Sequence, residues 1–290
     1  MPSLPHPSPS LDSATTQAIQ SNVSAALLED VGEGDLTALL VDSDRRATAT
    51  VSARQTAVVC GRPWFDEVFK QLDASIQVQW HVSEGQRVEA GSTWVELSGR
   101  ARALLTGERT ALNFLQLLSA VATQTDQYVQ AVSGTRARVV DTRKTIPGLR
   151  QAQKYAVRVG GGLNHRMGLY DGILIKENHI ASGGGITATL KRAQTIANRA
   201  QFVMIEVETL EQFAEALAAG ATLVLLDNMT PEQIVRAVEM NQGRAQLEVS
   251  GGVNLQTVQA LAKAGIDRIS IGALTKHISA IDLSMRIKEV

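Results

Sequence analysis

The chain has 290 residues, of which 44% are apolar and 20% are charged. This length and composition predict about two globular domains with an apolar core. The formal net charge is −1, so overall charge gives no reason to expect a nucleic acid or an anionic membrane surface as a partner. No window contains the ~18 consecutive apolar residues that a membrane-spanning helix needs.

Residues 1–15 are rich in proline and serine and lack the charged and apolar regions of a signal peptide. We therefore predict a disordered leader over this segment. Cys60 is the only cysteine and follows the apolar run Ala57–Val59, which is typical of a small core residue. A single cysteine excludes an intramolecular disulfide and fits the reducing cytoplasm, where we expect the protein to reside.

Residues 46–100 contain short strand-like runs separated by turns, with a helical pattern over Trp64–Leu72 inserted among them. The strand-like runs are Ala47–Val51, Thr56–Val59, Ile76–His81, Arg87–Ala90 and Thr93–Leu97. Residues 105–133 follow as one long helix with apolar residues at a spacing of three to four. These elements predict a first domain over residues 16–122.

From residue 136 the chain alternates short apolar runs with helical stretches. The apolar runs are Arg136–Asp141, Gly172–Lys176, Phe202–Val207, Thr222–Leu226, Gln246–Val249 and Arg268–Ile271. Helices over Thr209–Ala219, Thr230–Met240 and Asn254–Ala264 have cap, proline and glycine residues at their ends. Continuous apolar strands alternating with helices predict an α/β fold with a parallel sheet. Even spacing favours a barrel over a doubly wound sheet, although periodicity does not choose between them.

The segment 281–287 alternates apolar and polar residues with a period of two. It predicts an edge strand that returns to the first domain. We therefore assign residues 279–290 to the first domain and residues 123–278 to the second.

Polar residues and glycines follow all of the strands predicted for the second domain. Because ligands of parallel α/β folds bind at the carboxyl ends of the strands, these residues are expected to share one rim. The cations come first along the chain, then the acids and then the glycines: Arg143, Lys144, His165 and Arg166, Lys176; Glu206 and Asp227; Gly251, Gly252 and Gly272. A single lysine or an Asp-Asn pair at a strand end would be an ordinary solvated loop or turn, so the shared rim carries the interpretation.

This order of charges predicts three kinds of ligand group. Clustered cations suit a small polyanion, since arginine binds carboxylates through two hydrogen bonds. Two spaced carboxylates suit Mg²⁺ or ribose hydroxyls, and glycine turns offer backbone N–H groups to a phosphate. A P-loop is absent, the glycine run GGGLNHRMG lacks a dinucleotide-binding layout, and the histidines lack the HExxH spacing of a zinc site.

Seven motifs in order resemble the quinolinate phosphoribosyltransferase family over about residues 24–290. They are GERTALNFLQLLSAVAT, DTRKTIPGLR, KYAVRVGGGLNHRMGLYDGILIKENHI, IEVE, LLDN, SGG and ISIGALT. The resemblance implies an N-terminal α/β sandwich domain and an incomplete, about six-stranded α/β barrel. It also implies a homodimer or a higher oligomer, in which Arg109 reaches the site of the partner subunit.

The reaction that the resemblance implies joins quinolinate to phosphoribosyl pyrophosphate and gives nicotinate mononucleotide, pyrophosphate and CO₂, a step of NAD biosynthesis. The residues implied for quinolinate are Arg109, Thr142, Arg143, Lys144, His165, Arg166 and Lys176. Those implied for phosphoribosyl pyrophosphate are Lys144, Lys176, Glu206, Asp227, Ser250, Gly251, Gly252, Gly272 and Ala273. Lys144, Glu206 and Asp227 are implied as catalytic, and the two acids hold Mg²⁺ through water.

Three alternatives remain open on the sequence. A nicotinate-using enzyme of the same fold would need fewer cations, because nicotinate has one carboxylate. A molybdenum-transport-associated relative would contain similar motifs but act on another substrate. A non-catalytic binding protein for a phosphorylated metabolite would need the cations but not Lys144 together with Glu206 and Asp227.

Overall fold

The computed structural model describes residues 9–289 and divides into two units. The first contains the chain up to Asp126, Thr145–Gly161 and the segment from His277 onward, and the second contains Gln127–Lys144 and Gly162–Lys276. We predicted boundaries after residues 122 and 278, and the units change after Asp126 and Lys276. Residues 145–161, which we predicted in the second domain, belong to the first unit.

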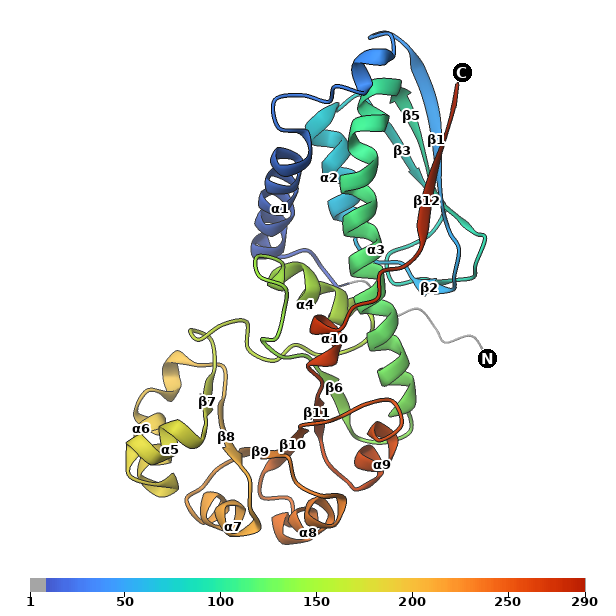
Figure 1. Cartoon of the computed structure of the whole chain (residues 1–290). Helices are drawn as coiled ribbons and strands as arrows, with labels where there is room; N and C mark the ends of the chain where they lie inside the picture. Colours follow the sequence, from blue (N-terminus) through green and yellow to red (C-terminus); the bar gives the residue numbers. More distant parts are fainter. Residues whose placement is uncertain (1–8, 290) are drawn as a thin grey trace. The chain divides into compact units, whose positions relative to one another are not determined.

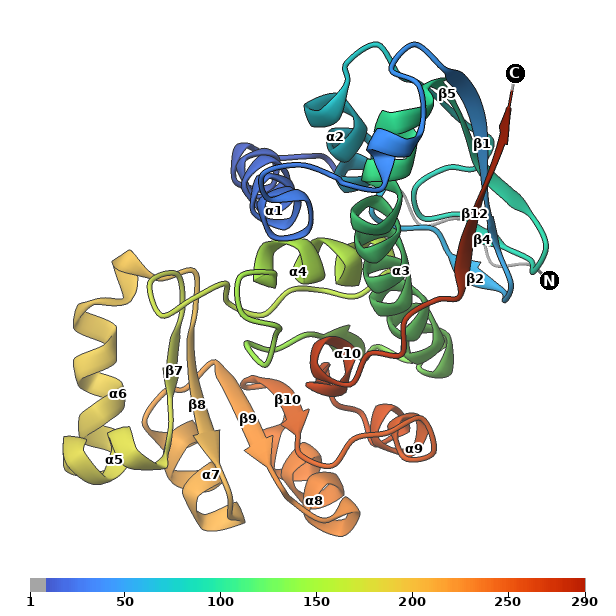
Figure 2. The same cartoon turned by 45° about the horizontal axis from the view of Figure 1, so that its top comes forward.

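The first unit is built on an antiparallel sheet with the strand order β12-β1-β5-β3. Helices α2 and α3 lie along one face of this sheet (Figure 2), and Trp64, Phe65 and Phe69 of α2 are buried. The elements are α1 (Ser13–Val31), η1 (Ala38–Leu40), β1 (Arg46–Ala53), β2 (Ala57–Val58), α2 (Arg62–Leu72), β3 (Gln77–Trp80), β4 (Arg87–Val88), β5 (Thr93–Arg100), α3 (Ala101–Ala131, whose last turn belongs to the second unit), α4 (Arg150–Val159) and β12 (Leu283–Glu289).

The ends of the described chain test two predictions. Strand β12 pairs antiparallel with β1 from Ala53–Leu283 to Ala47–Glu289, which confirms the predicted returning edge strand. The predicted leader lies partly outside the described residues, at 1–8. Its last residues are not a leader, because the Asp12 side chain accepts the backbone N–H of Thr15 and caps α1 from Ser13.

The second unit is a parallel sheet surrounded by helices. Its strands are β6 (Arg138–Val140), β7 (Ile173–Ile175), β8 (Val203–Val207), β9 (Leu223–Asp227), β10 (Gln246–Ser250) and β11 (Arg268–Ser270). Its helices are α5 (Glu177–Gly183), α6 (Ile186–Thr195), η2 (Ala197–Arg199), α7 (Leu210–Ala218), α8 (Pro231–Asn241), α9 (Val258–Lys263) and α10 (Ala273–Lys276). All of the predicted strands are confirmed, whereas α1, α4, α5, α6 and α10 were not predicted.

The strand order resolves the choice between a barrel and a doubly wound sheet. The order is β6-β11-β10-β9-β8-β7, so strands adjacent in the chain are adjacent in the sheet from β7 to β11. The first strand, β6, pairs with the last, β11, in parallel, while β6 and β7 do not pair with each other. A doubly wound sheet would reverse its order at one point. The predicted incomplete six-stranded barrel is therefore confirmed.

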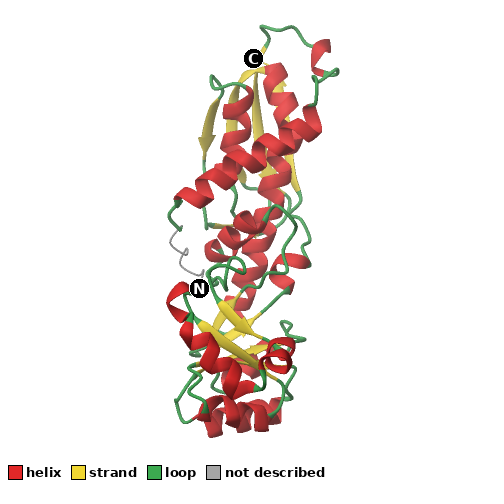
Figure 3. Cartoon of the chain, turned by 90° about the vertical axis from the view of Figure 1, so that its left-hand side faces the viewer, coloured by secondary structure: helices red, strands yellow, loops and turns green. Residues whose placement is uncertain are grey.

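Helices α6 to α9 lie outside the curve of the strands (Figure 1). Figure 3 shows the strands of this unit in yellow with red helices on both sides of them. On the β7–β9 side, the sheet carries an apolar cluster of Met204, Leu223 and Leu225, against which Leu174 and Phe202 pack. Among the described residues, no helix has the length and apolar character needed to span a membrane.

Candidate active site

The carboxyl ends of the barrel strands enclose a cavity of about 170 Å³. Most of the predicted quinolinate-binding residues line it, and they come from three separate segments of the second unit. The lining residues are Thr142, Arg143, Lys144, His165, Arg166, Leu174, Lys176, Glu206, Leu225, Ser250 and Ser270. Five of these side chains are basic and one is acidic, so the cavity suits a multiply anionic ligand.

The segment that follows β6 is held by short-range contacts. The Thr142 hydroxyl accepts the backbone N–H of Lys144 at 3.0 Å, and the hydroxyl of Thr275 in α10 donates to the Lys144 carbonyl at 2.7 Å. These contacts fix the Lys144 main chain and leave its side chain exposed at the rim. The cation is therefore available to a ligand.

His165 and Arg166 lie at the end of a segment that runs alongside β6. Leu163 forms a parallel bridge with Val140, and the Asp141 carboxylate then accepts the backbone N–H of His165 at 2.8 Å. Arg166 donates from Nη1 to the Gly172 carbonyl at 2.9 Å. Burial, and secondly the charge of Arg143, lower the pKa of Arg166. Two guanidinium groups thus lie close together in the pocket, where an anion would relieve their repulsion.

Comparison with known proteins identifies the family. Residues 35–119 match the profile of the quinolinate phosphoribosyl transferase N-terminal domain, and residues 121–286 match that of its C-terminal domain. The chain belongs to the quinolinate phosphoribosyltransferase family. A probable nicotinate-nucleotide pyrophosphorylase [carboxylating] of Bacillus subtilis is 40% identical over 260 residues, which are 90% of each chain.

Solved structures agree with this assignment to the quinolinate phosphoribosyltransferase family. The nicotinate-nucleotide pyrophosphorylase of Francisella tularensis superposes with a TM-score of 0.91 at 45% identity, over 94% of this chain and 97% of that one. NadC of Streptococcus pyogenes superposes with a TM-score of 0.92 at 39% identity, over 97% and 100% of the two chains. The fold described above is therefore the fold of these proteins.

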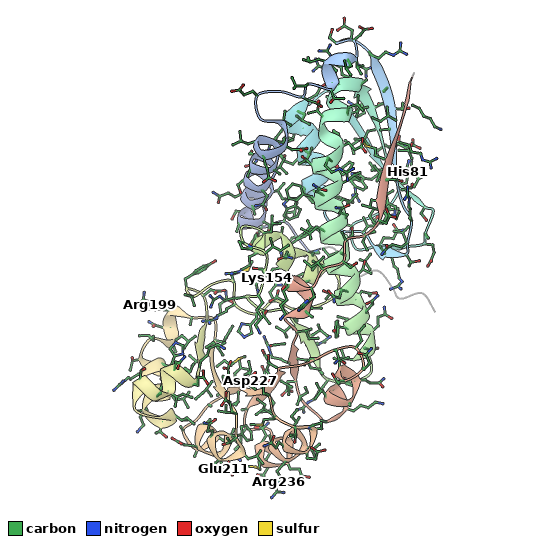
Figure 4. The ribbon with its side chains drawn as sticks, viewed as in Figure 1. His81, Lys154, Arg199, Glu211, Asp227 and Arg236 are labelled. Carbon is green, nitrogen blue, oxygen red and sulfur yellow. The ribbon has the colours of Figure 1, made fainter. Side chains whose placement is uncertain are left out.

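The two predicted metal-binding acids lie on neighbouring strands. Glu206 is in β8 and Asp227 ends β9, and these strands pair in parallel. Burial, and secondly the charge of Glu206, raise the pKa of Asp227. Figure 4 shows Asp227 on the inner side of the strands, whereas Glu211 and Arg236 point outward from α7 and α8. Two carboxylates that repel each other at an open rim are a favourable donor set for a cation.

The carboxylates of Glu206 and Asp227 fit Mg²⁺ better than a metal ion whose ligands all come from protein side chains. Within residues 9–289, no group of three or more His, Cys, Asp and Glu side chains is arranged to bind a metal. Mg²⁺ keeps several waters and uses one or two carboxylates together with substrate phosphates. Glu206 also accepts two contacts from Lys176 Nζ, at 2.9 and 3.2 Å, so its charge is partly balanced when no ligand is bound.

The glycines after β10 and β11 differ in how closely they are packed. Gly251 has φ +96°, which side chains other than glycine rarely adopt, and a Cβ there would collide with the Asn228 side chain. A Cβ at Gly272 would lie 3.1 Å from Lys144 Cδ. The predicted phosphate segment at Gly272 therefore lies directly beside the predicted catalytic lysine.

Several predicted site residues do not line the cavity itself. They are Asp227, Gly251, Gly252, Gly272 and Ala273, which belong to the same rim, and Arg109, which is exposed on α3 of the first unit. Conversely, the sequence did not predict Leu174, Leu225 and Ser270, which line the cavity. Each lies on a strand, two residues before a predicted site residue at or just beyond the end of that strand (Lys176, Asp227 and Gly272). This period of two was the available indication.

Proposed function

We propose that this protein transfers the 5-phosphoribosyl group of phosphoribosyl pyrophosphate to quinolinate, giving nicotinate mononucleotide, pyrophosphate and CO₂. The observation that carries the proposal is the cavity with five basic side chains and one acidic side chain. Quinolinate has two carboxylates, and the sugar donor adds a pyrophosphate and a 5-phosphate. The family matches support the same reaction, because relatives are named quinolinate phosphoribosyltransferase [decarboxylating].

Orientation of quinolinate is the first task of the site. Arg143, His165 and Arg166 bind its carboxylates, so that the pyridine nitrogen points at C1 of the sugar. Holding the two reactants in this geometry removes much of the entropic barrier to a bimolecular reaction. The buried Arg166 and His165 contribute most to this step, because the Asp141 carboxylate holds the backbone of His165 and the Gly172 carbonyl holds the Arg166 guanidinium.

Charge stabilisation at C1 is the second task. Departure of pyrophosphate leaves positive charge on the sugar and negative charge on the leaving group. Lys144 stabilises the leaving group from the rim, while Glu206 and Asp227 hold the ribose hydroxyls and support the cationic sugar. Mg²⁺, when bound at Glu206 and Asp227 through water, would neutralise further charge on the pyrophosphate.

Loss of CO₂ needs no basic residue. After the pyridine nitrogen bonds to C1, the ring is a pyridinium and accepts the electron pair of the breaking C–C bond. The 2-carboxylate beside this nitrogen then leaves as CO₂, and C2, which keeps the electron pair of the broken bond, takes up a proton from solvent. The site has to release one carboxylate while holding the other.

The decisive experiment is a turnover assay with Mg²⁺ and phosphoribosyl pyrophosphate that compares quinolinate with nicotinate. We expect CO₂ and mononucleotide in equal amounts from quinolinate and little product from nicotinate. Turnover of nicotinate alone would contradict the two-carboxylate pocket. Absence of turnover with either acid, from folded protein, would favour a divergent relative or a binding protein.

We further propose that the protein is a cytoplasmic homodimer in which Arg109 completes the partner's site. Arg109 lies one turn after Leu105 on an exposed face of α3, and Thr106 of the same turn binds Asp35 in the loop before η1. The first unit also exposes several leucines of α1, η1, α3 and the loop before η1: Leu28, Leu36, Leu39, Leu40 and Leu105. A second copy would cover part of this apolar surface, since exposed apolar surface commonly marks an interface.

Mixing two inactive variants tests the shared site. Arg109→Ala and Arg143→Ala should each be nearly inactive, and a mixture that exchanges subunits should regain about a quarter of wild-type activity, because half of the dimers are hybrids with one intact site. Lack of recovery with proven subunit exchange would show that Arg109 acts within its own chain.

A further inference from the structure

The turn that follows β9 contains a residue in an unusual backbone conformation. Asn228 has φ +52°, in the left-handed region that residues other than glycine rarely adopt. Within residues 9–289, the other non-glycine residue in this region is Gln242, with φ +49°. Gln242 ends α8, where a left-handed residue is an ordinary helix terminator. Asn228 instead follows a strand at the rim of the barrel, and strained backbone at such a place points to function.

The side-chain amide of Asn228 holds the carboxylate next to it. Nδ2 of Asn228 donates to Oδ2 of Asp227 at 2.8 Å. Glu206 lies on the neighbouring strand β8 and repels the Asp227 carboxylate. A neutral N–H donor beside Asp227 favours its ionised form without adding a charge to the rim. The contact also fixes the direction of this carboxylate, which lies on the inner side of the strands (Figure 4).

Asn228 also contacts the strand that follows in the sheet. Its backbone N–H donates to the Ser250 carbonyl at 3.2 Å, which extends the pairing of β9 and β10 beyond the pair Asp227–Ser250. A Cβ at Gly251 would collide with Oδ1 of Asn228. The Asn228 side chain is therefore packed between the end of β9 and the glycine turn after β10.

This position separates two parts of the predicted sugar-donor site. Asp227 is predicted to hold ribose hydroxyls, whereas Ser250, Gly251 and Gly252 are predicted to bind the 5-phosphate. A ligand that binds both parts needs a fixed spacing between them, and setting the spacing in advance lowers the cost of binding. Asn228 is exposed, so a bound donor would exclude water from its contacts and strengthen them.

We propose that Asn228 is a positioning residue for the sugar donor: its amide orients the Asp227 carboxylate toward the ribose and holds it at a fixed place relative to the Ser250–Gly252 turn. The inference rests on the proposed function for the identity of the donor, phosphoribosyl pyrophosphate. It concerns binding of the donor rather than of the acceptor, because the predicted quinolinate-binding residues lie on other segments.

A purely conformational role for Asn228 makes a different prediction. Asparagine tolerates the left-handed region better than most residues do, which would explain its presence by the backbone alone. Glycine would then serve equally well, because it adopts positive φ without strain. Asn228→Gly separates the two roles, since it keeps the backbone conformation and removes the amide.

The test measures binding of phosphoribosyl pyrophosphate to the full-length protein by isothermal titration calorimetry, with Mg²⁺ and phthalate present. Phthalate has the two carboxylates of quinolinate but no ring nitrogen, so it cannot bond to C1. In Asn228→Gly we expect the Kd of the donor to rise about tenfold, as for loss of one hydrogen bond to a charged group. Steady-state assays should show a higher KM for phosphoribosyl pyrophosphate, with the KM for quinolinate and the Tm unchanged.

Gln242→Gly is the matched control, because it makes the same change at the other left-handed residue. Gln242 lies between α8 and the start of β10, at the opposite end of the strands from the rim. Its substitution should leave the donor Kd and both KM values at their wild-type levels. Wild-type donor affinity in Asn228→Gly would overturn the proposal. A joint rise of both KM values in Asn228→Gly would also overturn it, because the effect would then be a general disturbance of the rim.

Asn228→Asp keeps the test decisive if Asn228→Gly does not fold. Aspartate has the same shape and also tolerates the left-handed region, but it lacks the amide N–H and adds a negative charge beside Asp227. Donor affinity should fall at least as far as in Asn228→Gly, and wild-type affinity would contradict the proposal.

The wild type distinguishes failure of this inference from failure of the proposed function. If it binds the donor but does not turn over quinolinate, the proposed function is wrong, and the donor affinities of the variants still decide the role of Asn228. If it does not bind phosphoribosyl pyrophosphate, both are wrong. If it turns over quinolinate and the variants bind the donor equally well, only this inference is wrong.

Discussion

The barrel contains two glutamate–cation pairs that differ in depth. At the rim, Lys176 Nζ lies 2.9 Å from Glu206, and the two side chains are 48% and 13% exposed. Beneath it, Arg268 Nε lies 2.7 Å from Glu248, and the exposures are 21% and 0%. The two N–O distances are nearly equal, so the pairs differ mainly in their exposure to water. Lys176 and Glu206 at the rim can each bind a ligand in place of the other, whereas Arg268 and Glu248 stay paired.

Substitution of the rim lysine Lys144 should have the largest effect on activity. Lys144→Ala should lower turnover by roughly 10²–10³-fold, the usual loss when a group that stabilises transition-state charge is removed. Thermal unfolding should barely change, because the side chain is exposed and its backbone contacts remain. Lys191→Ala, on exposed α6, is the control; near-normal turnover of Lys144→Ala would contradict the assigned role.

Substitution of the cation should lower the free energy of unfolding by clearly different amounts in the two pairs. Arg268→Ala should lower the free energy of unfolding by about 3–5 kcal/mol, because Glu248 is left buried without its main partner. Lys176→Ala should lower it by less than about 1 kcal/mol, as is usual for an exposed ion pair, while weakening quinolinate binding. Urea unfolding of both variants measures the difference. Equal losses would show that depth does not distinguish the pairs.

Salt should affect the rim more than the buried pair. Raising KCl from about 0.05 to about 0.5 M shortens the screening length severalfold, so the KM for quinolinate should rise several-fold. The contribution of the buried Arg268–Glu248 pair to the free energy of unfolding should change little over the same range. Steady-state kinetics and urea unfolding of the wild type and Arg268→Ala, recorded in the same buffers, test both parts. A KM that does not depend on salt would argue against a cationic pocket.

The smallest expected effect is on stability at Asp227. Its pKa is raised, first by burial and then by Glu206, so the charged carboxylate destabilises the fold at pH 7. Asp227→Asn should therefore raise Tm by no more than about 2 °C, since water screens a half-exposed group. The gain should disappear at acid pH, once the wild-type carboxyl is protonated in both states. A lower Tm at pH 7 would contradict this sign.

The sequence predicted the rim residues because each can be recognised from the segment of chain immediately before it. Lys144, Lys176 and Asp227 each follow an apolar run, and parallel strands place their carboxyl ends together. It also predicted the six strands β6 to β11 of the barrel, since strands buried on both faces are continuous apolar runs.

What the sequence did not predict depends on pairing between distant segments. Helix α4, Gln151 of which binds Thr15 of α1, joins the first unit although it lies within the barrel segment of the chain. Glu248 lies within the predicted strand Gln246–Val249. An acidic residue inside such a strand was an indication that it has a buried partner. Its match with Arg268 required the register of β10 and β11, which spacing alone does not give.

The position of β12 has a consequence for biosynthesis. This strand pairs along the whole of β1, yet the ribosome makes it only after the barrel. Until then, one edge of β1 has no backbone partner, and an open edge can pair with another nascent chain. The barrel, whose strands are mostly close in sequence, can form first, whereas the first unit closes last. Chaperone dependence and aggregation during expression should therefore follow the integrity of Leu283–Glu289 rather than the stability of the catalytic barrel.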